Sequence, residues 1–147
     1  MVDREEPRAE TASGIVVGVD GSESCLRAAE WAAREAALRN EPLVIAHVHS
    51  WERHHESPKF DLLIQHEEEL LRTATDRARA INADISIEAK SLDPTVMHGL
   101  VAESKDASML VLGFTERGPV EGFLMGSATR QCLHHAYCTV VVVRKAE

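Results

Sequence analysis

The chain has 147 residues, enough for one domain that buries about two-thirds of its unfolded surface on a core. Its 24 acidic residues outnumber 16 Lys and Arg residues, and the net charge of −8 disfavours a nucleic-acid backbone or an anionic membrane as the main partner. No apolar run approaches the ~18 residues of a membrane span, and the N-terminus lacks a signal pattern, so we expect a cytoplasmic protein.

The first elements follow a charged start. Residues 1–13 carry dense charge without an apolar period, which predicts a disordered acidic tail before a domain at 14–145. Residues 14–19 are apolar on both alternating faces, as in strands buried within parallel sheets. Ser22 can then cap a helix whose apolar positions recur at helical spacing as far as Ala36, and Asn40-Glu41-Pro42 ends that helix.

Strands and helices keep alternating to the end of the chain. The third strand alternates apolar and polar residues, which indicates one wet face and a place near the sheet edge. Glu67 belongs to the charged side of the second helix, and we expect that side to be solvated. The expected strands are 14–19, 43–49, 85–90, 109–112 and 139–144, and the expected helices follow Ser22, span 61–82, begin at Pro94 and span 127–135. The helix that begins at Pro94 is expected to face inward with Met97, Leu100, Val101 and Ser104.

Five strands alternating with four helices predict a doubly wound, open parallel α/β sheet, because parallel strands need crossover connections. In such folds the ligand lies beyond the carboxyl ends of the strands, where the strand order reverses. Asp20 and Gly113 both stand at such ends.

A glycine-rich stretch from Met109 to Ser127 has the order strand, loop and helix start. Backbone N–H groups at a helix N-terminus lack partners within the helix, so they stabilise phosphate oxygens without a charged side chain. This stretch therefore predicts a nucleotide site.

Several stretches together resemble one family. They are Val17-Gly18-Val19-Asp20-Gly21-Ser22, Ala46-His47-Val48, Met109-Leu110-Val111-Leu112-Gly113, Gly126-Ser127 and the segment from Leu133 to Arg144. These stretches are similar to the strands, turns and final helix of the universal stress protein family, and the resemblance covers Gly14 to Lys145. It implies a Rossmann-like fold, related to the adenine nucleotide α-hydrolases, with strand order 3-2-1-4-5 and its switch point between strands one and four.

Many members of that family bind ATP through the pattern Gly-x-x-Gly-x9-Gly-Ser/Thr. The resemblance matches the first glycine to Gly113, the third to Gly126 and the hydroxyl residue to Ser127. The second glycine falls on Glu116, whose side chain and charge oppose a close phosphate. We expect this carboxylate to weaken ATP binding about ten- to a thousandfold.

Three arrangements would relieve that repulsion. Glu116 can face solvent, it can be neutralised by Arg117 or by Mg²⁺, or Gly118 and Gly122 can supply the loop's flexibility from shifted positions. The sequence does not choose among them.

The family resemblance implies binding roles for three further residues. It implies that Asp20 contacts adenine or ribose, that Val48 lies beside the adenine, and that Thr129 is a weaker phosphate candidate. Three of the candidate site residues have a structural alternative as well: Asp20 as a turn residue that bonds its own backbone, Val48 as plain core, and Ser127 as a helix N-cap.

Metal and disulfide chemistry have weaker support. His47 and His49 share one face of a strand and suggest a metal, but no carboxylate or cysteine stands at a matching spacing. Cys25, Cys132 and Cys138 share no Cys-x-x-Cys spacing, so free thiols are expected.

We therefore expect a regulatory ATP-binding protein that is not a conventional enzyme, because no catalytic motif is present. Weak ATP hydrolysis is an alternative, since Asp20-Gly21-Ser22-Glu23-Ser24 is faintly similar to the loop of ATP pyrophosphatases. A dimeric interaction protein with an empty pocket is another. The unbroken apolar strand Thr139–Arg144 predicts a homodimer paired along that edge, as the resemblance also implies.

Overall fold

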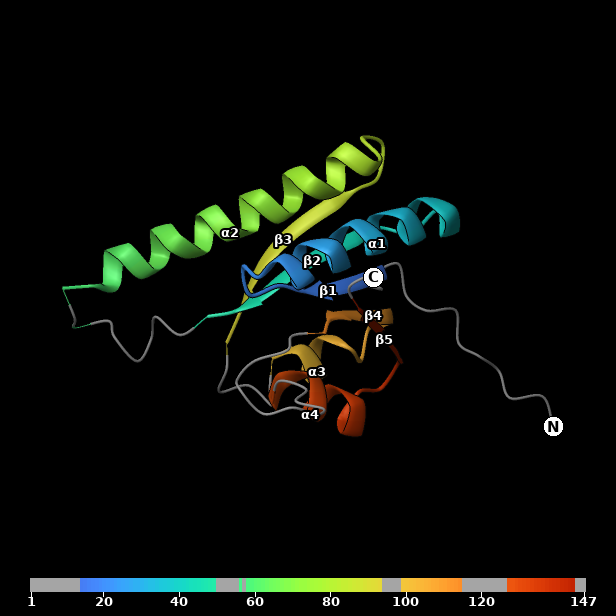
Figure 1. Ribbon diagram of the computed structural model, residues 1–147. Coiled ribbons are helices and arrows are strands. Elements are labelled where there is room, and N and C mark those ends of the chain that lie inside the picture. Colours follow the sequence, from blue (N-terminus) through green and yellow to red (C-terminus); the bar gives the residue numbers. More distant parts are fainter. Residues whose placement is uncertain (1–13, 50–55, 57, 94–98, 115–126, 145–147) are drawn as a thin grey trace.

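The computed structural model describes residues 14–49, 56, 58–93, 99–114 and 127–144, so the expected tail at 1–13 lies outside the described residues. Figure 1 shows the alternation of strands and helices. Within the described ranges no helix is long and apolar enough to cross a membrane. The strands are β1 (Gly14–Gly18), β2 (Leu43–Val48), β3 (Ile87–Leu92), β4 (Ala107–Gly113) and β5 (Thr139–Val143), and the helices are α1 (Glu23–Arg39), α2 (Phe60–Ile81), α3 (Leu100–Glu103) and α4 (Ser127–His135).

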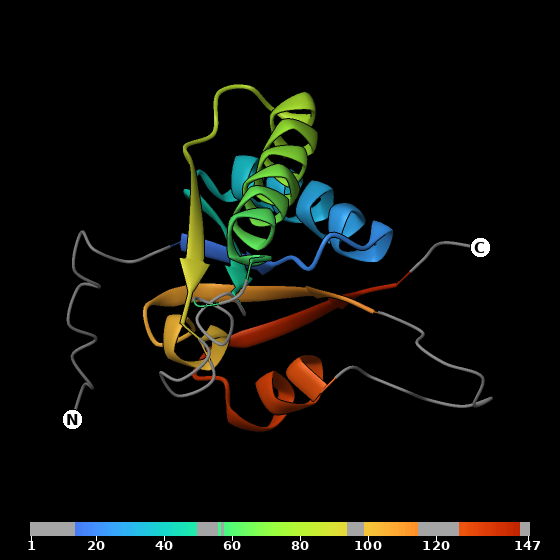
Figure 2. The ribbon, with the colours of Figure 1, turned by 90° about the vertical axis from the view of Figure 1, so that its left-hand side faces the viewer.

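The five strands form one parallel sheet in the order β3-β2-β1-β4-β5. All five residues of the central strand β1 are buried, because helices cover both faces of the sheet. Helices α1 and α2 pack on one face, and α3 and α4 pack on the other (Figure 1 and Figure 2). The doubly wound fold expected from the sequence is confirmed, and so is the strand order that the family resemblance implies.

The face covered by α1 and α2 combines small helix residues with branched strand residues. Ile15, Val17 and Val111 project from the sheet into this cluster. The alanines that meet them leave room for the helix to lie close to the strands at interior packing density. The fully buried alanines of α1 are Ala28, Ala29, Ala32, Ala33 and Ala36.

The face covered by α3 and α4 includes a buried hydroxyl among apolar side chains. Leu110 of β4 packs in the same cluster as Cys132 of α4. Ser104 is fully buried, donates its hydroxyl to the carbonyl of Val101 at 2.6 Å and accepts the N–H of Tyr137 at 3.0 Å. Both hydrogen-bonding capacities are used, which removes the cost of burying this polar group.

The third expected helix is described only in part. Its expected start at Pro94 and its expected inward residue Met97 lie outside the described residues. Helix α3 begins at Leu100, and Leu100, Val101 and Ser104 are buried as predicted.

Strand β3 lies at the sheet edge, as expected, but it begins two residues later than the alternation predicts. Its register is set by β2, with Ile87 opposite Leu43 and Leu92 opposite Val48. Ile85, which precedes the strand, is nevertheless buried because it packs with side chains of α1 and α2. Ile85 therefore fits the apolar alternation of a strand in sequence, although it lies before β3 and is buried beneath the two helices.

The prediction of a solvated outer face for α2 is wrong at Glu67. This side chain is buried, and its Oε1 accepts the hydroxyl hydrogen of Ser91 at 2.6 Å. A carboxylate can be buried where a hydrogen-bond donor meets it, and β3 supplies that donor beneath α2.

Both ends of α1 have the caps that the sequence predicts. The hydroxyl of Ser22 accepts the N–H of Cys25 at 3.3 Å and so satisfies one free donor of the first turn. Asn40 has φ 54°, and its N–H donates to carbonyls of the last turn, which ends the helix in the left-handed conformation.

Candidate functional site

The carboxyl ends of β1 and β4 lie side by side at one edge of the sheet. Val17 pairs with Val111, so Val19 and Gly113 stand at matching positions two residues further along. The chain leaves β1 for α1 on one face, whereas α4, which follows β4, lies on the opposite face. Ligands of open α/β sheets bind where connections diverge in this way. The strand ends at Asp20 and Gly113 therefore mark the candidate site.

Asp20 follows β1 and has an exposed side chain. Its Oδ1 accepts the backbone N–H of Ser22 at 2.8 Å, which is the bond of a turn residue to its own backbone. Asp20 thus has the role of a turn residue, which is the structural alternative considered for it. A carboxylate has about four acceptor positions, so this bond leaves capacity for a hydroxyl donor of a ligand.

The thiol of Cys25 lies beside that turn in the first turn of α1. Burial raises the pKa of this thiol, a hydrogen bond with Ser22 lowers it, and the Asp20 carboxylate raises it. The net shift is upward, so the thiol stays protonated near neutral pH and the nucleophilic thiolate is scarce. Cys25 is therefore not an activated nucleophile at this edge.

Gly113, the last residue of β4, is in close contact with the first turn of α1. A Cβ atom at this position would lie 2.7 Å from the carbonyl carbon and oxygen of Ser24 and 2.8 Å from the nitrogen of Cys25. Real Cβ atoms do not approach backbone so closely, so any other residue would push α1 away. The packing of α1 against β4 thus explains this glycine, whether or not a phosphate lies nearby.

Val48 is the last residue of β2 and is half-buried. Its Cγ2 lies 3.3 Å from the position that a Cβ of Gly99 would occupy, and it packs with Leu92 against the α3–α4 face. The alternative of a plain core residue is therefore supported for this side chain.

Two of the predicted loop residues, Glu116 and Gly126, lie outside the described residues. Ser127 is the first residue of α4, although its side chain is not described, and Thr129 on the first turn is buried. Helix α4 ends shortly before β5 begins, so it runs against the strand direction and its start lies at the carboxyl edge (Figure 2). The expected helix start after the glycine loop is thus confirmed, and its free N–H groups point toward this edge.

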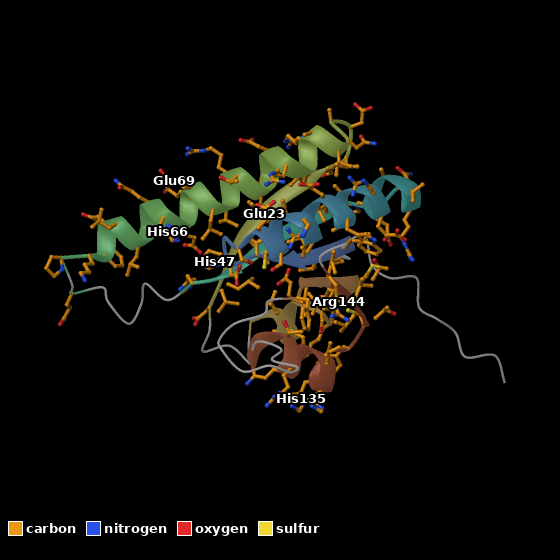
Figure 3. The ribbon with its side chains drawn as sticks, in the orientation of Figure 1. Glu23, His47, His66, Glu69, His135 and Arg144 are labelled. Carbon is orange, nitrogen blue, oxygen red and sulfur yellow. The ribbon has the colours of Figure 1, made fainter. Side chains whose placement is uncertain are left out.

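His47, a metal candidate in sequence, bonds instead to the backbone at the end of β1 (Figure 3). Its Nδ1 lies 2.8 Å from the carbonyl oxygen of Val19, and because a carbonyl only accepts, Nδ1 carries the hydrogen. Within the described ranges, no three His, Cys, Asp or Glu side chains are grouped so that they could hold a metal ion. His47 thus holds the end of β2 to the turn after β1.

Sequence reasoning missed one contact at this edge. The guanidinium carbon of Arg144, which follows β5, lies 4.9 Å from the centre of the Phe114 ring. The N–H of Phe114 also donates to the carbonyl of Val143 at 2.9 Å, so the β4–β5 pairing continues one residue past the strands. The parallel register of the two apolar strands, which sets Gly113 opposite Val143, was the signal that could have revealed the pair.

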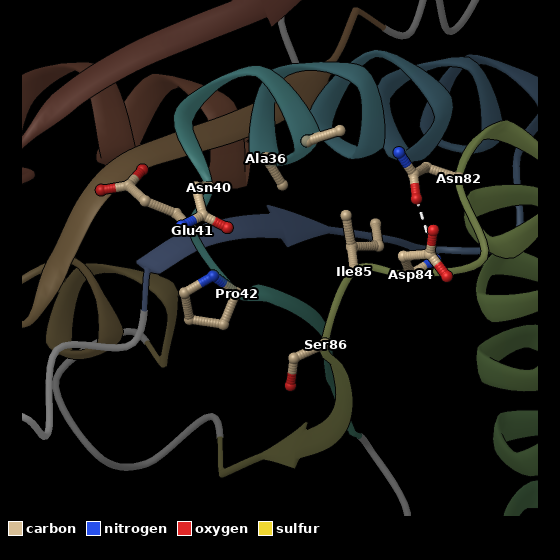
Figure 4. Close-up of a pocket in the computed structure, with 9 residues that line it drawn as sticks. Ala36, Asn40, Glu41, Pro42, Asn82, Asp84, Ile85 and Ser86 are labelled. Atoms are coloured by element: carbon tan, nitrogen blue, oxygen red, sulfur yellow. Dashed lines mark hydrogen bonds between the residues drawn. The ribbon is translucent and has the colours of Figure 1, made fainter.

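A cavity among the described residues lies at the opposite edge of the sheet (Figure 4). Its volume is about 360 Å³, and it opens between the end of α1 and the turn that leads from α2 into β3. None of the predicted site residues lines it. The lining residues are Ala36, Ala37, Asn40, Glu41, Pro42, Asn82, Asp84, Ile85 and Ser86.

The sequence model of the universal stress protein family matches residues 13–144, which include every strand from β1 to β5. The chain belongs to the universal stress protein family. A universal stress protein of Mycolicibacterium smegmatis is 33% identical over 145 residues, which cover 90% of this chain and 48% of the relative. One from Mycobacterium tuberculosis is 32% identical over 156 residues, which cover 91% and 49%. The chain thus spans about half the length of the curated relatives it matches.

Solved universal stress proteins share the fold. One that was crystallised in complex with cAMP is 30% identical, has a TM-score of 0.69 and covers 92% of this chain and 98% of its own. Another, from Archaeoglobus fulgidus, has a TM-score of 0.73 at 24% identity, covering 88% of this chain and 97% of its own, and so shows the fold alone.

Proposed function

We propose that this universal stress protein is a regulatory module that binds an adenine nucleotide at the carboxyl edge between β1 and β4. The observation that carries the proposal is the meeting of three elements at this edge: the end of β4, the first turn of α1 packed against it, and the start of α4. Free N–H groups at helix starts stabilise phosphate oxygens. The 30% identical neighbour solved with cAMP, an adenine nucleotide, supports the same class of ligand.

In this proposal the nucleoside and the phosphates contact different strands. The exposed carboxylate of Asp20 accepts a ribose hydroxyl or the adenine amino group, and the backbone at Val48 borders the base. The phosphates lie between Gly113 and the start of α4, near Ser127 and Thr129. Gly126 belongs with them as the third glycine of the loop pattern.

ATP is the nucleotide that the glycine pattern predicts, and Glu116 is the residue that opposes it. Two like charges about 4 Å apart repel by roughly 4 kcal/mol at an effective dielectric near 20, and by about 1 kcal/mol in water. Mg²⁺ bound to the phosphates would reduce this repulsion. We therefore propose weak ATP binding in the wild-type chain, relieved by removal of the carboxylate.

Calorimetric titration of ATP into the wild type, Glu116→Gln and Glu116→Gly tests this proposal. Loss of the charge alone should tighten binding about tenfold in Glu116→Gln, and the added backbone freedom should tighten it further in Glu116→Gly. Glu69→Gln, which changes an exposed carboxylate of α2, is the matched control and should bind like the wild type. Equal affinities in all four proteins would show that Glu116 faces away from the phosphates.

The class of nucleotide is tested with ATP, AMP, cAMP and adenosine on the same proteins. If the adenine and ribose groups bind at Asp20 and Val48, all four ligands should compete for one site. Absence of binding by all four, to the wild type and to Glu116→Gly alike, would refute the nucleotide proposal and favour the interaction protein with an empty pocket.

We also propose that the bound nucleotide is sensed rather than turned over. The Cys25 thiol agrees with this, because burial raises its pKa and the thiol is therefore not an activated nucleophile. Phosphate release from ATP should equal the rate of a Gly126→Val variant. A wild-type rate clearly above that variant would support the alternative of a weak ATP hydrolase.

A homodimer paired along β5 is the second proposal. Among the described strands β5 pairs with β4 alone, and its valines are only half-buried. Such an unpaired apolar edge is a template for a second strand. Light scattering after size exclusion should give a dimer at micromolar concentration. Val142→Lys should shift it to a monomer, whereas Leu38→Lys, which replaces an exposed leucine of α1, should not.

A further inference from the structure

The end of β5 carries a cation that the glycine loop pattern does not include. Arg144 is exposed, and none of the ion pairs of the described residues involves it. Its guanidinium carbon lies 4.9 Å from the centre of the Phe114 ring. Figure 3 shows Arg144 beside β4 and β5. The cation therefore stacks on the residue that follows Gly113, the first glycine of the proposed phosphate site.

Strand alternation shows which face of the sheet this pair occupies. Leu110 and Leu112 of β4 and Val140 of β5 all pack in the cluster with α4. Side chains two residues apart share a face, so Phe114 and Arg144 continue these two rows on the α4 side. The ring contact between them agrees with this assignment.

The start of α4 lies on that same face and at that same edge, because α4 runs against the strands. A helix N-terminus carries a partial positive charge, and Arg144 adds a full one. A guanidinium also offers a planar fork of N–H groups that matches two phosphate oxygens. The described end of β4–β5 therefore presents an anion-binding arrangement that does not depend on any residue of the loop.

We infer that Arg144 contacts the phosphates of the bound nucleotide and that Phe114 positions it. The inference rests on the proposed nucleotide function. Stacking on the ring fixes the guanidinium plane, so less side-chain freedom is lost when the phosphates bind.

The test compares ATP and adenosine affinities in the full chain by calorimetry. Arg144→Gln should weaken ATP binding about 10- to 100-fold, because it removes charge-assisted hydrogen bonds, and should leave adenosine binding unchanged. Arg144→Lys should recover part of the loss, because the charge is retained without the fork. Phe114→Leu should weaken ATP binding about two- to fivefold, because only the stack is lost.

Arg79→Gln is the matched control, since it removes one exposed arginine from the last turn of α2, at the opposite edge. Its ATP affinity should stay within about twofold of the wild type, which separates a local contact from the change in net charge. If Arg144→Gln and Arg79→Gln bind ATP alike while the wild type binds both ligands, the role of Arg144 is refuted and the nucleotide function stands. If neither the wild type nor Glu116→Gly binds either ligand, the proposed function fails and this inference fails with it.

Discussion

The two edges of the sheet differ in the helix ends that they gather and in shape. At the carboxyl edge, α1 and α4 begin, Arg144 is exposed, and the backbone of α1 packs directly against Gly113. At the amino edge, α1 and α2 end, Asp84 is exposed, and a cavity of about 360 Å³ opens (Figure 4). Because a helix is partly positive at its start and partly negative at its end, the same helix favours anions at one edge and repels them at the other.

This difference teaches that the presence of a cavity does not identify a phosphate site. The cavity at the amino edge faces the end of α1 and the carboxylate of Asp84, and no basic residue is among those that line it. The described carboxyl edge gathers the helix starts and an arginine beside the strand ends. The helix starts, rather than a hollow shape, lead us to place the nucleotide at the carboxyl edge.

The largest effect should follow from filling the close contact at the carboxyl edge. Gly113→Ala places a Cβ atom within 2.8 Å of the α1 backbone, so we expect a loss of about 3 kcal/mol in the free energy of unfolding and weaker nucleotide binding. Gly21→Ala is the control, because its Cβ would meet nothing closer than 3.8 Å although its φ is +88°. It should cost about 1 to 2 kcal/mol. Urea unfolding of both variants measures the difference, and equal losses would contradict the close packing.

A second effect tests whether the α4 face between the edges excludes water. Burial raises the pKa of the Cys132 thiol to about 11, and the neighbouring Cys138 adds to the shift. The folded state thus favours the neutral thiol, and its stabilisation is complete below pH 9 and lost as the pH rises through 11. The loss amounts to about 2 to 3 kcal/mol.

Urea unfolding between pH 8 and 10.5 checks this expectation. Stability should fall with pH in the wild type and in Cys138→Ala, and the fall should be clearly smaller in Cys132→Ala. An unchanged slope in Cys132→Ala would mean that another group causes it.

The smallest effect belongs to the amino edge. Asn40 has φ 54° at the end of α1, so Asn40→Ala should cost about 1 kcal/mol in unfolding free energy, whereas Asn40→Gly should be nearly neutral. Neither change should alter ATP affinity, because the cap lies at the edge away from the proposed site. A change in affinity as large as that of Gly113→Ala would remove the functional contrast between the two edges.

Local patterns in the sequence predicted much of the fold. The continuous apolar run at β1 indicated a strand covered on both faces, and Ser22 and Asn40 were identified as the ends of α1. Predictions failed where a residue's neighbour came from a distant element. Glu67 of α2 was expected to be solvated because its partner, Ser91, belongs to the distant strand β3. Ile85 was assigned to β3 because its own segment does not indicate that α1 and α2 cover it.

The candidate site likewise combines features that the sequence predicted with contacts that only the structure shows. The order of strand, glycine loop and helix start was readable from the sequence, and α4 begins where that order predicts. The sequence did not reveal that Gly113 is needed to let α1 approach, that His47 bonds to Val19, or that Arg144 stacks on Phe114. Each of these contacts joins residues of different elements, and their spacing depends on strand register.

The sequence by itself determined the type and order of the elements, because periodicity, caps and turns act over a few neighbouring residues. Only the tertiary structure decided which side chains and which helix ends meet at each edge. The parallel register of the sheet is the physical reason, since it gathers the ends of strands that lie far apart in the chain and aligns the helix starts beside them.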